Sequence, residues 1–92
     1  MSFKTRARWR RTRIANDIRA DEQMLRTMIY TLRMSIDYGR GMRDSAAEGG
    51  PFAGIYAEEF ARVVFGIPRE RARIRELRRQ IRRREADLME AA

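Results

Sequence analysis

The chain has 92 residues and a mass of 10.9 kDa, which is enough for one small domain and too short for a separate substrate domain. Hydrophobic residues make up 43% and charged residues 37% of the sequence, a balance that excludes a disordered tail and suits long helices with one apolar stripe. Because 21 Lys and Arg oppose 13 Asp and Glu, the net charge is +8 and a negatively charged partner is expected.

The sequence contains no cysteine and no histidine. Disulfides and thiolate sites are therefore excluded, and the commonest metal ligand and general base are missing as well. We accordingly expect a binding protein rather than an enzyme, with no cofactor and no metal. No apolar run approaches the roughly 18 residues of a membrane span, and the charged start lacks the apolar core of a signal peptide, so we expect a cytoplasmic protein that does not enter a membrane.

The first predicted element is a helix over residues 6–40. Its apolar residues recur at spacings of three, four and seven, as they do on one face of a helix: Ile14, Ile18, Leu25, Met28, Ile29, Leu32 and Ile36. Gly39 and Gly41 can end this helix, and residues 41–51 are predicted to form a loop.

Two further helices are predicted, over residues 52–65 and 68–91. Pro51 and Pro68 each suit the first turn of a helix, where the missing N–H costs nothing. The first of these helices carries an aromatic and apolar stripe made of Phe52, Tyr56, Phe60 and Val64. The second continues a heptad-like pattern of Ile and Leu, which Arg84 interrupts where an apolar residue is expected.

These elements predict an all-α fold in a single domain over residues 1–92. The favoured arrangement is an elongated antiparallel helical hairpin with a coiled-coil seam, whose second arm is kinked at Gly66–Pro68. A small three-helix bundle is the alternative, although it would have to bend the first helix between residues 14 and 36, where there is neither Gly nor Pro.

The charge is unevenly placed along the predicted hairpin. Residues 1–22 carry a net charge of +4 and residues 66–92 carry another +4, whereas residues 23–65 are neutral. A genome rich in G and C could explain why 20 of the 21 basic residues are Arg, but it does not explain this placement. The pattern instead predicts a basic tip at the open end of the hairpin and an apolar base at the loop.

The sharpest local signal is the basic arm formed by residues 1–13. It contains six basic residues, no acidic residue and the only tryptophan: Lys4, Arg6, Arg8, Trp9, Arg10, Arg11 and Arg13. Arginine forms bidentate hydrogen bonds to phosphate, and an indole can stack on an unpaired base. The arginines Arg82, Arg83 and Arg84 are added to this candidate site. In the structural alternative, Trp9 packs against Leu88 or Met89 and the arginines remain solvated.

Two functions are compatible with these patterns. The first is a non-enzymatic module that binds the backbone of RNA or DNA without strong sequence specificity, because the basic arm has no Asn or Gln to pair with adenine. The second is a protein-binding module, such as an assembly component, adaptor or inhibitor, that docks on an acidic protein surface. The short length and the arginine bias of the chain are typical of small accessory proteins of bacteria and mobile elements, although no motif of a known family is present.

The apolar stripe at the loop end makes a further prediction. Phe52, Tyr56, Phe60 and Val64 exceed what one facing helix can cover, so we expect a homodimer or an obligate partner at this end.

Overall fold

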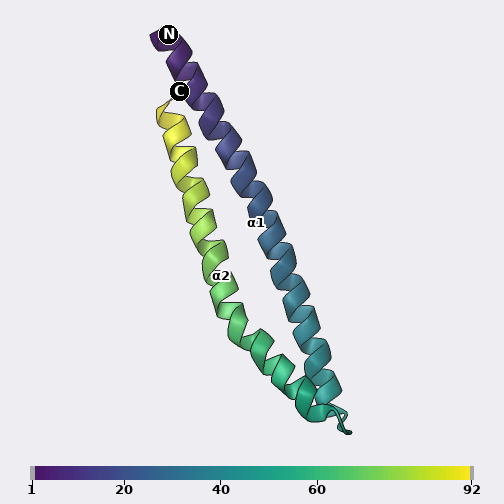
Figure 1. Ribbon diagram of the computed structural model, residues 1–92. Helices are drawn as coiled ribbons and strands as arrows, with labels where there is room; N and C mark the ends of the chain where they lie inside the picture. Colours follow the sequence, from purple (N-terminus) through teal and green to yellow (C-terminus); the bar gives the residue numbers. More distant parts are fainter. Residues whose placement is uncertain (1, 92) are drawn as a thin grey trace. The chain divides into compact units, whose positions relative to one another are not determined.

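The protein is an all-α antiparallel helical hairpin. The computed structural model describes residues 2–91, in which two helices, α1 (Phe3–Ala47) and α2 (Ala53–Glu90), are joined by one short loop (Figure 1). The expected fold class is therefore confirmed, and the three-helix alternative is not the fold of the described chain. The hairpin comprises two compact units, unit 1 (Met1–Thr27 with Ile74–Ala92) and unit 2 (Met28–Arg73). Each unit is an antiparallel pair made of one segment from each helix.

The observed helices differ from the ranges expected from sequence because of their caps. The backbone N–H of Thr5 donates to Ser2 Oγ at 3.2 Å, which lets α1 begin at Phe3 rather than near residue 6. Gly39 and Gly41 do not end α1, since neither takes a positive φ. The helix ends after Ala47, where Gly49 and Gly50 adopt φ values of 77° and 93°.

The second arm is one continuous helix rather than two. Pro68 lies inside α2, and because proline has no N–H, it leaves the carbonyl four residues earlier without its helical partner. Figure 1 shows α2 bending in its green part, and a proline inside a helix is an expected cause of a bend. The turn before α2 is closed by hydrogen bonds from Ala53 N to Gly50 O at 3.3 Å and from Tyr56 N to Phe52 O at 3.2 Å.

Buried and half-buried positions recur at alternating spacings of three and four along both helices, which is the heptad pattern of a coiled coil. We call these positions the seam. They are Ala7, Arg11, Ile14, Ile18, Asp21, Leu25, Met28, Leu32, Ser35, Gly39, Met42 and Ala46 in α1, and Ala53, Tyr56, Phe60, Val63, Ile67, Glu70, Ile74, Leu77, Ile81, Arg84 and Leu88 in α2.

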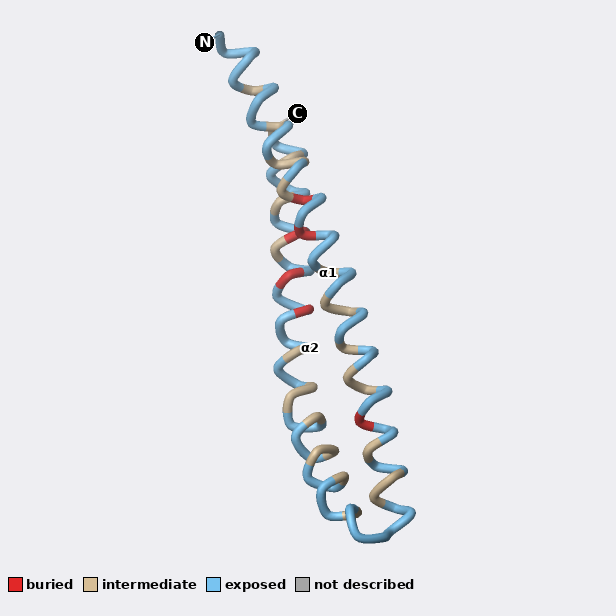
Figure 2. Tube along the Cα trace, turned by 45° about the vertical axis from the view of Figure 1, so that its right-hand side comes forward, coloured by how far each residue is buried: buried red, intermediate tan, exposed pale blue. Residues whose placement is uncertain are grey.

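The tightest packing lies in unit 1. Its buried apolar side chains are Ile18, Ile74, Leu77 and Ile81, with exposed fractions of 6–8% (Figure 2). No described side chain is less than 2% exposed, so a pair of helices leaves even its best-covered residues close to solvent.

Unit 2 is packed more loosely along its seam. Gly39 is its one described buried residue, and a Cβ added there would lie 3.1 Å from Val63 Cγ1, so α1 and α2 approach each other closely at this point.

Two polar groups of unit 2 also lie near the seam. One carboxylate oxygen of Glu70 is buried without a hydrogen-bond partner among the described residues, which costs stability. Tyr38 from α1 meets Glu59 from α2 beside the seam; burial and this carboxylate raise the pKa of the Tyr38 phenol.

Candidate nucleic-acid interface

The basic residues are concentrated in unit 1. Unit 1 holds fourteen basic and seven acidic residues, whereas unit 2 holds seven basic and six acidic residues. Of the fourteen, only Arg79, Arg83 and Arg84 form an ion pair with a described acidic residue. Eleven basic side chains of this unit are therefore available for a negatively charged partner.

The N-terminal part of α1 presents most of the basic arm to solvent. Lys4, Arg6, Arg8, Arg10 and Arg13 are exposed, and Arg11 is half-buried on the seam. The Ser2 cap supports the helical start of this segment, and within it Thr12 Oγ1 donates a hydrogen bond to the Arg8 carbonyl at 3.0 Å. Because no acidic residue occurs before Asp17, nothing within this stretch of the helix neutralises these side chains.

Trp9 lies on the outer side of α1. It is 62% exposed, and the guanidinium carbon of Arg13 is 5.9 Å from the centre of its ring, within cation–π distance. A shallow hollow of about 380 Å³ beside it is lined by Trp9, Thr12, Arg13, Asn16 and Asp17, all of them from α1. The indole face is therefore accessible from outside the hairpin.

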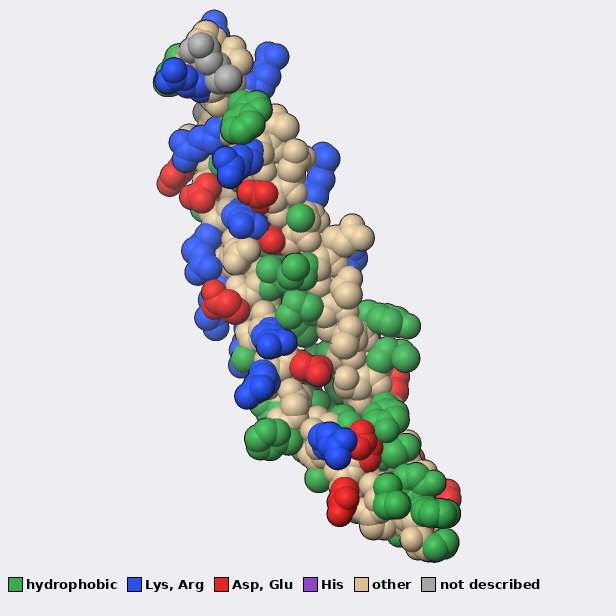
Figure 3. Space-filling model, viewed as in Figure 1, with side chains coloured by type: hydrophobic (Ala, Val, Ile, Leu, Met, Phe, Trp, Pro, Cys, Tyr) green, Lys and Arg blue, Asp and Glu red, His purple; other side chains and the backbone are tan. Residues whose placement is uncertain are grey.

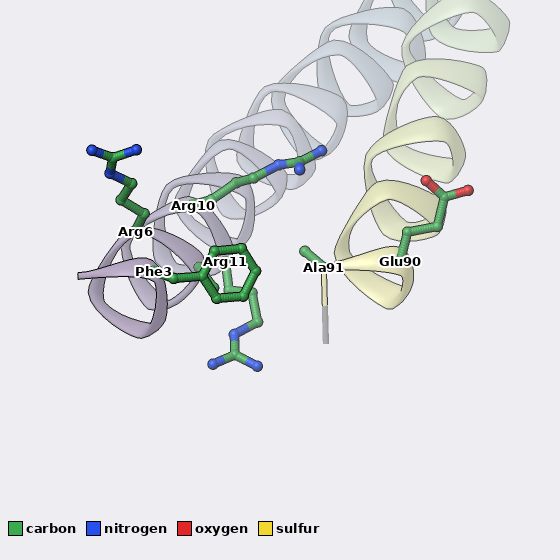
Figure 4. Close-up of a pocket in the computed structure, with 7 residues that line it drawn as sticks. Phe3, Arg6, Arg10, Arg11, Glu90 and Ala91 are labelled. Carbon is green, nitrogen blue, oxygen red and sulfur yellow. The ribbon is translucent and has the colours of Figure 1, made fainter. Parts of the chain in front are cut away.

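A second hollow, of about 540 Å³, lies between the first turns of α1 and the last turn of α2 (Figure 4). Phe3, Arg6, Ala7, Arg10 and Arg11 line it from α1, and Glu90 and Ala91 line it from the end of α2. Figure 4 shows the guanidinium groups of Arg6, Arg10 and Arg11 pointing in different directions around the Phe3 ring. This divergence suits contacts spread over an extended anion rather than the enclosure of one small anion.

Six arginines of unit 1, two of which (Arg8 and Arg82) belong to the predicted site, lie along one side of the helix pair, an arrangement that the sequence did not reveal. When the seam is written as heptad positions a and d, these residues occupy positions b and e, which border the same side of an antiparallel pair. We call them the arginine flank: Arg8, Arg19 and Arg26 on α1, and Arg75, Arg78 and Arg82 on α2. All six are exposed, and none forms an ion pair with a described residue.

The opposite flank of unit 1 is electrostatically balanced. Arg79 Nη1 and Arg83 Nη2 both contact the carboxylate of Glu76, at 2.9 Å and 3.2 Å. Asp17, Asp87 and Glu90 occupy the same side. On the arginine flank, by contrast, only Glu22 and Glu85 oppose six arginines. Figure 3 shows one face of the molecule, on which acidic and basic side chains are interspersed over unit 1.

The three arginines of the predicted run 82–84 have different environments. Arg82 belongs to the arginine flank, and Arg83 pairs with Glu76. Arg84 lies on the seam and donates a hydrogen bond to Asp21 Oδ2, which also accepts one from Gln80 Nε2 at 3.2 Å. Asp21 is only 7% exposed. Arg84 is therefore placed to hold the two helices together, and its guanidinium is already engaged by the Asp21 carboxylate.

The four residues of the predicted apolar stripe also divide. Tyr56 and Phe60 are half-buried on the seam against α1, whereas Phe52 and Val64 are 59% and 45% exposed.

Among the described residues, no group of three acidic side chains is arranged to hold a metal ion. Within residues 2–91, neither helix has an apolar stretch long enough to cross a membrane.

The regular spacing of the arginine flank is the signal that could have found it. Arg19 and Arg26 are seven residues apart, as are Arg75 and Arg82, and residues at this spacing return to the same side of a coiled-coil helix. Which two rows lie side by side depends on the pairing of the helices, which only the structure supplies.

Comparison with protein families, curated proteins and solved structures finds no match to this chain.

Proposed function

We propose that the protein is a non-enzymatic module that binds the phosphate backbone of nucleic acid through unit 1. The observation that carries this proposal is that eleven of the fourteen basic side chains of the unit form no ion pair with a described residue, and that six of them line one flank. Arginine is suited to this role because its planar guanidinium donates two parallel hydrogen bonds to phosphate.

The arrangement favours backbone contacts over base reading. The arginine flank contains no Asn or Gln that could pair with adenine, and its side chains are spaced along two helix axes rather than gathered at one helix end. Along one helix, residues seven apart are separated by about 10.5 Å, so the flank extends over several phosphates. We therefore expect binding that depends strongly on salt and weakly on sequence.

The test is binding of a fluorescently labelled oligonucleotide of mixed sequence, single-stranded and duplex, followed by anisotropy at several KCl concentrations. In the double variant Arg78→Gln/Arg82→Gln, the salt dependence of binding should weaken. The slope of log affinity against log salt concentration should fall in magnitude by about 1.4–1.8, since each phosphate contact contributes about 0.7–0.9. The matched control is Arg79→Gln with Arg83→Gln, which removes the same charge from the same helix but from side chains already paired with Glu76.

The control pair should change the slope by less than half as much as the flank pair. Equal effects of the two pairs would show that net charge alone matters and would overturn the role of the arginine flank. If neither single-stranded nor duplex nucleic acid binds at the lowest salt, where electrostatic affinity is greatest, the proposal is wrong. The remaining candidate is then an acidic protein surface, which would be recognised by the same guanidinium groups.

A further inference from the structure

The part of α2 in unit 2 has a second apolar face, which lies away from the seam and is bordered by Glu58. The residues of this outer face of α2 are uncharged and exposed: Gly54, Ala57, Ala61, Val64, Phe65 and Pro68. Phe65 is 84% exposed, which is extreme for a ring in the middle of a helix. The seam residues of the same stretch already pack against α1. A helix that is apolar on two sides needs a second covering surface.

We propose that a second copy of this chain covers this face, with the two α2 helices antiparallel about a two-fold axis at Ala61. Positions at equal distances from Ala61 then lie opposite each other. Ala57 and Phe65 are both four residues from Ala61, and Gly54 and Pro68 are both seven residues from it. The Phe65 ring of each copy would therefore rest over the small residue Ala57 of the other copy.

The sizes of these side chains favour a second copy over an unrelated partner. Along the outer face, the small residues Gly54, Ala57 and Ala61 come first and the large residues Val64 and Phe65 follow. A two-fold axis requires that one patch be complementary to itself, and the antiparallel arrangement places Phe65 over Ala57 and Pro68 over Gly54 on both sides of the axis. The space beside Gly54 is open to receive a side chain of the other copy, because a Cβ added at Gly54 would meet nothing within 4 Å.

The distribution of charge permits this contact in unit 2 but opposes one in unit 1. Unit 2 has nearly equal numbers of basic and acidic residues, and Arg40, Arg43 and Arg62 are paired with acidic neighbours. Two copies of unit 1 would instead bring two strongly positive surfaces together.

The rim of the outer face is also complementary. Glu58 borders this face and has no ion pair within the described chain. The two-fold axis brings Glu58 of one copy to within two residues, about 3 Å along the helix axis, of Arg62 in the other copy. Opposite charges therefore flank the apolar centre on both sides of the axis. This inference does not depend on the proposed binding of nucleic acid.

The absence of cysteine from the sequence makes a direct test possible. In the full-length variant Ala61→Cys, the two introduced thiols would face each other at the axis, and mild oxidation should give a disulfide-linked dimer that reductant reverses. The matched control is Ala72→Cys, which is exposed on the same side of α2. In the proposed dimer its two copies lie 22 residues apart, about 33 Å along the axis, so it should remain unlinked.

Sedimentation of the unmodified chain supplies the second measurement. The protein should be a dimer, and Phe65→Ser should weaken the association by at least about 100-fold, as expected for an aromatic residue buried in an interface. Phe52→Ser, which removes an exposed ring from the turn before α2, outside the proposed contact, should leave the dimer unchanged. Circular dichroism would verify that both variants remain helical.

Three results would overturn the proposal. The first is a monomer at high concentration. The second is equal crosslinking at positions 61 and 72, which would indicate random collision. The third is a dimer that Phe52→Ser dissociates and Phe65→Ser does not, because that dimer would use a different face.

Discussion

At the scale of single residues, the pair formed by Arg84 and Asp21 accounts for the interruption of the apolar pattern in α2. The sequence shows the interruption, because Arg84 stands where the heptad requires an apolar residue. It does not show the partner, which lies 63 positions away on the other helix. Identifying it requires the register between the helices, and neither helix specifies that register by itself.

We expect the pair to behave as a partly buried ion pair. Arg84→Leu leaves the Asp21 carboxylate with only Gln80 as a donor and should lower the free energy of unfolding by about 1–3 kcal/mol. Replacing both residues by Leu should be close to neutral or stabilising, because the charge and its partner are removed together. Urea denaturation measures both variants.

Arg83→Leu is the control for this experiment. Its partner Glu76 is exposed and is shared with Arg79, so the loss should stay below about 1 kcal/mol. A double Leu variant that is as unstable as Arg84→Leu would contradict the assignment of a compensated ion pair.

At the scale of elements, the end of α1 shows where sequence reasoning reaches its limit. Gly39 and Gly41 are plausible helix ends by composition, yet both are helical, and the left-handed residues are Gly49 and Gly50. The helix continues because Met42 and Ala46 remain on the seam. Gly39 itself has a packing role, because it lets α1 approach Val63 of α2. Tertiary packing, which local propensity does not contain, decides these boundaries.

The two glycines should respond differently to alanine. Gly41→Ala should raise the free energy of unfolding by about 0.5–1 kcal/mol, since an added Cβ meets nothing within 4 Å and alanine reduces the entropy lost on folding. Gly39→Ala should gain less or be destabilising, because its Cβ would lie 3.1 Å from Val63 Cγ1.

A double-mutant cycle isolates that contact. In the background of Val63→Ala, Gly39→Ala should approach the gain seen at Gly41, so the cycle should show a coupling of about 0.5 kcal/mol or more. Additive effects in urea denaturation would mean that the close approach does not limit the choice of residue at position 39.

At the scale of the whole molecule, the sequence favours the antiparallel hairpin over a three-helix bundle, and it also shows the uneven charge. Periodicity specifies two apolar stripes, one loop joins them, and counting charges along the chain places the excess toward the two ends. The arginine flank does not follow. It combines Arg19 and Arg26 with Arg75, Arg78 and Arg82, and sequence spacing cannot decide which rows of two helices share a side.

The charge of unit 1 should make the stability of the protein increase with salt. Fourteen basic residues face only seven acidic ones in this unit, and raising the ionic strength from about 0.01 to 0.15 M shortens the screening length from about 30 to 8 Å. We expect Tm, measured by circular dichroism, to rise over this range. Arg78→Gln with Arg82→Gln should have a higher Tm at low salt and a shallower rise. A Tm that falls with added salt would contradict repulsion within this unit.

The single loop between Ala47 and Ala53 also has a consequence for how the chain assembles. The contact of Gly39 with Val63 closes 24 residues of chain, whereas the pair of Asp21 with Arg84 closes 63. Loop-closure entropy makes the longer closure more costly by about 0.9 kcal/mol, unless the inner contacts have formed first. Pairing therefore propagates most cheaply outward from the loop, so that loosely packed unit 2 forms early and the best-buried residues, in unit 1, meet last. We therefore expect the segment that nucleates folding to be distinct from the segment that holds the folded hairpin most tightly.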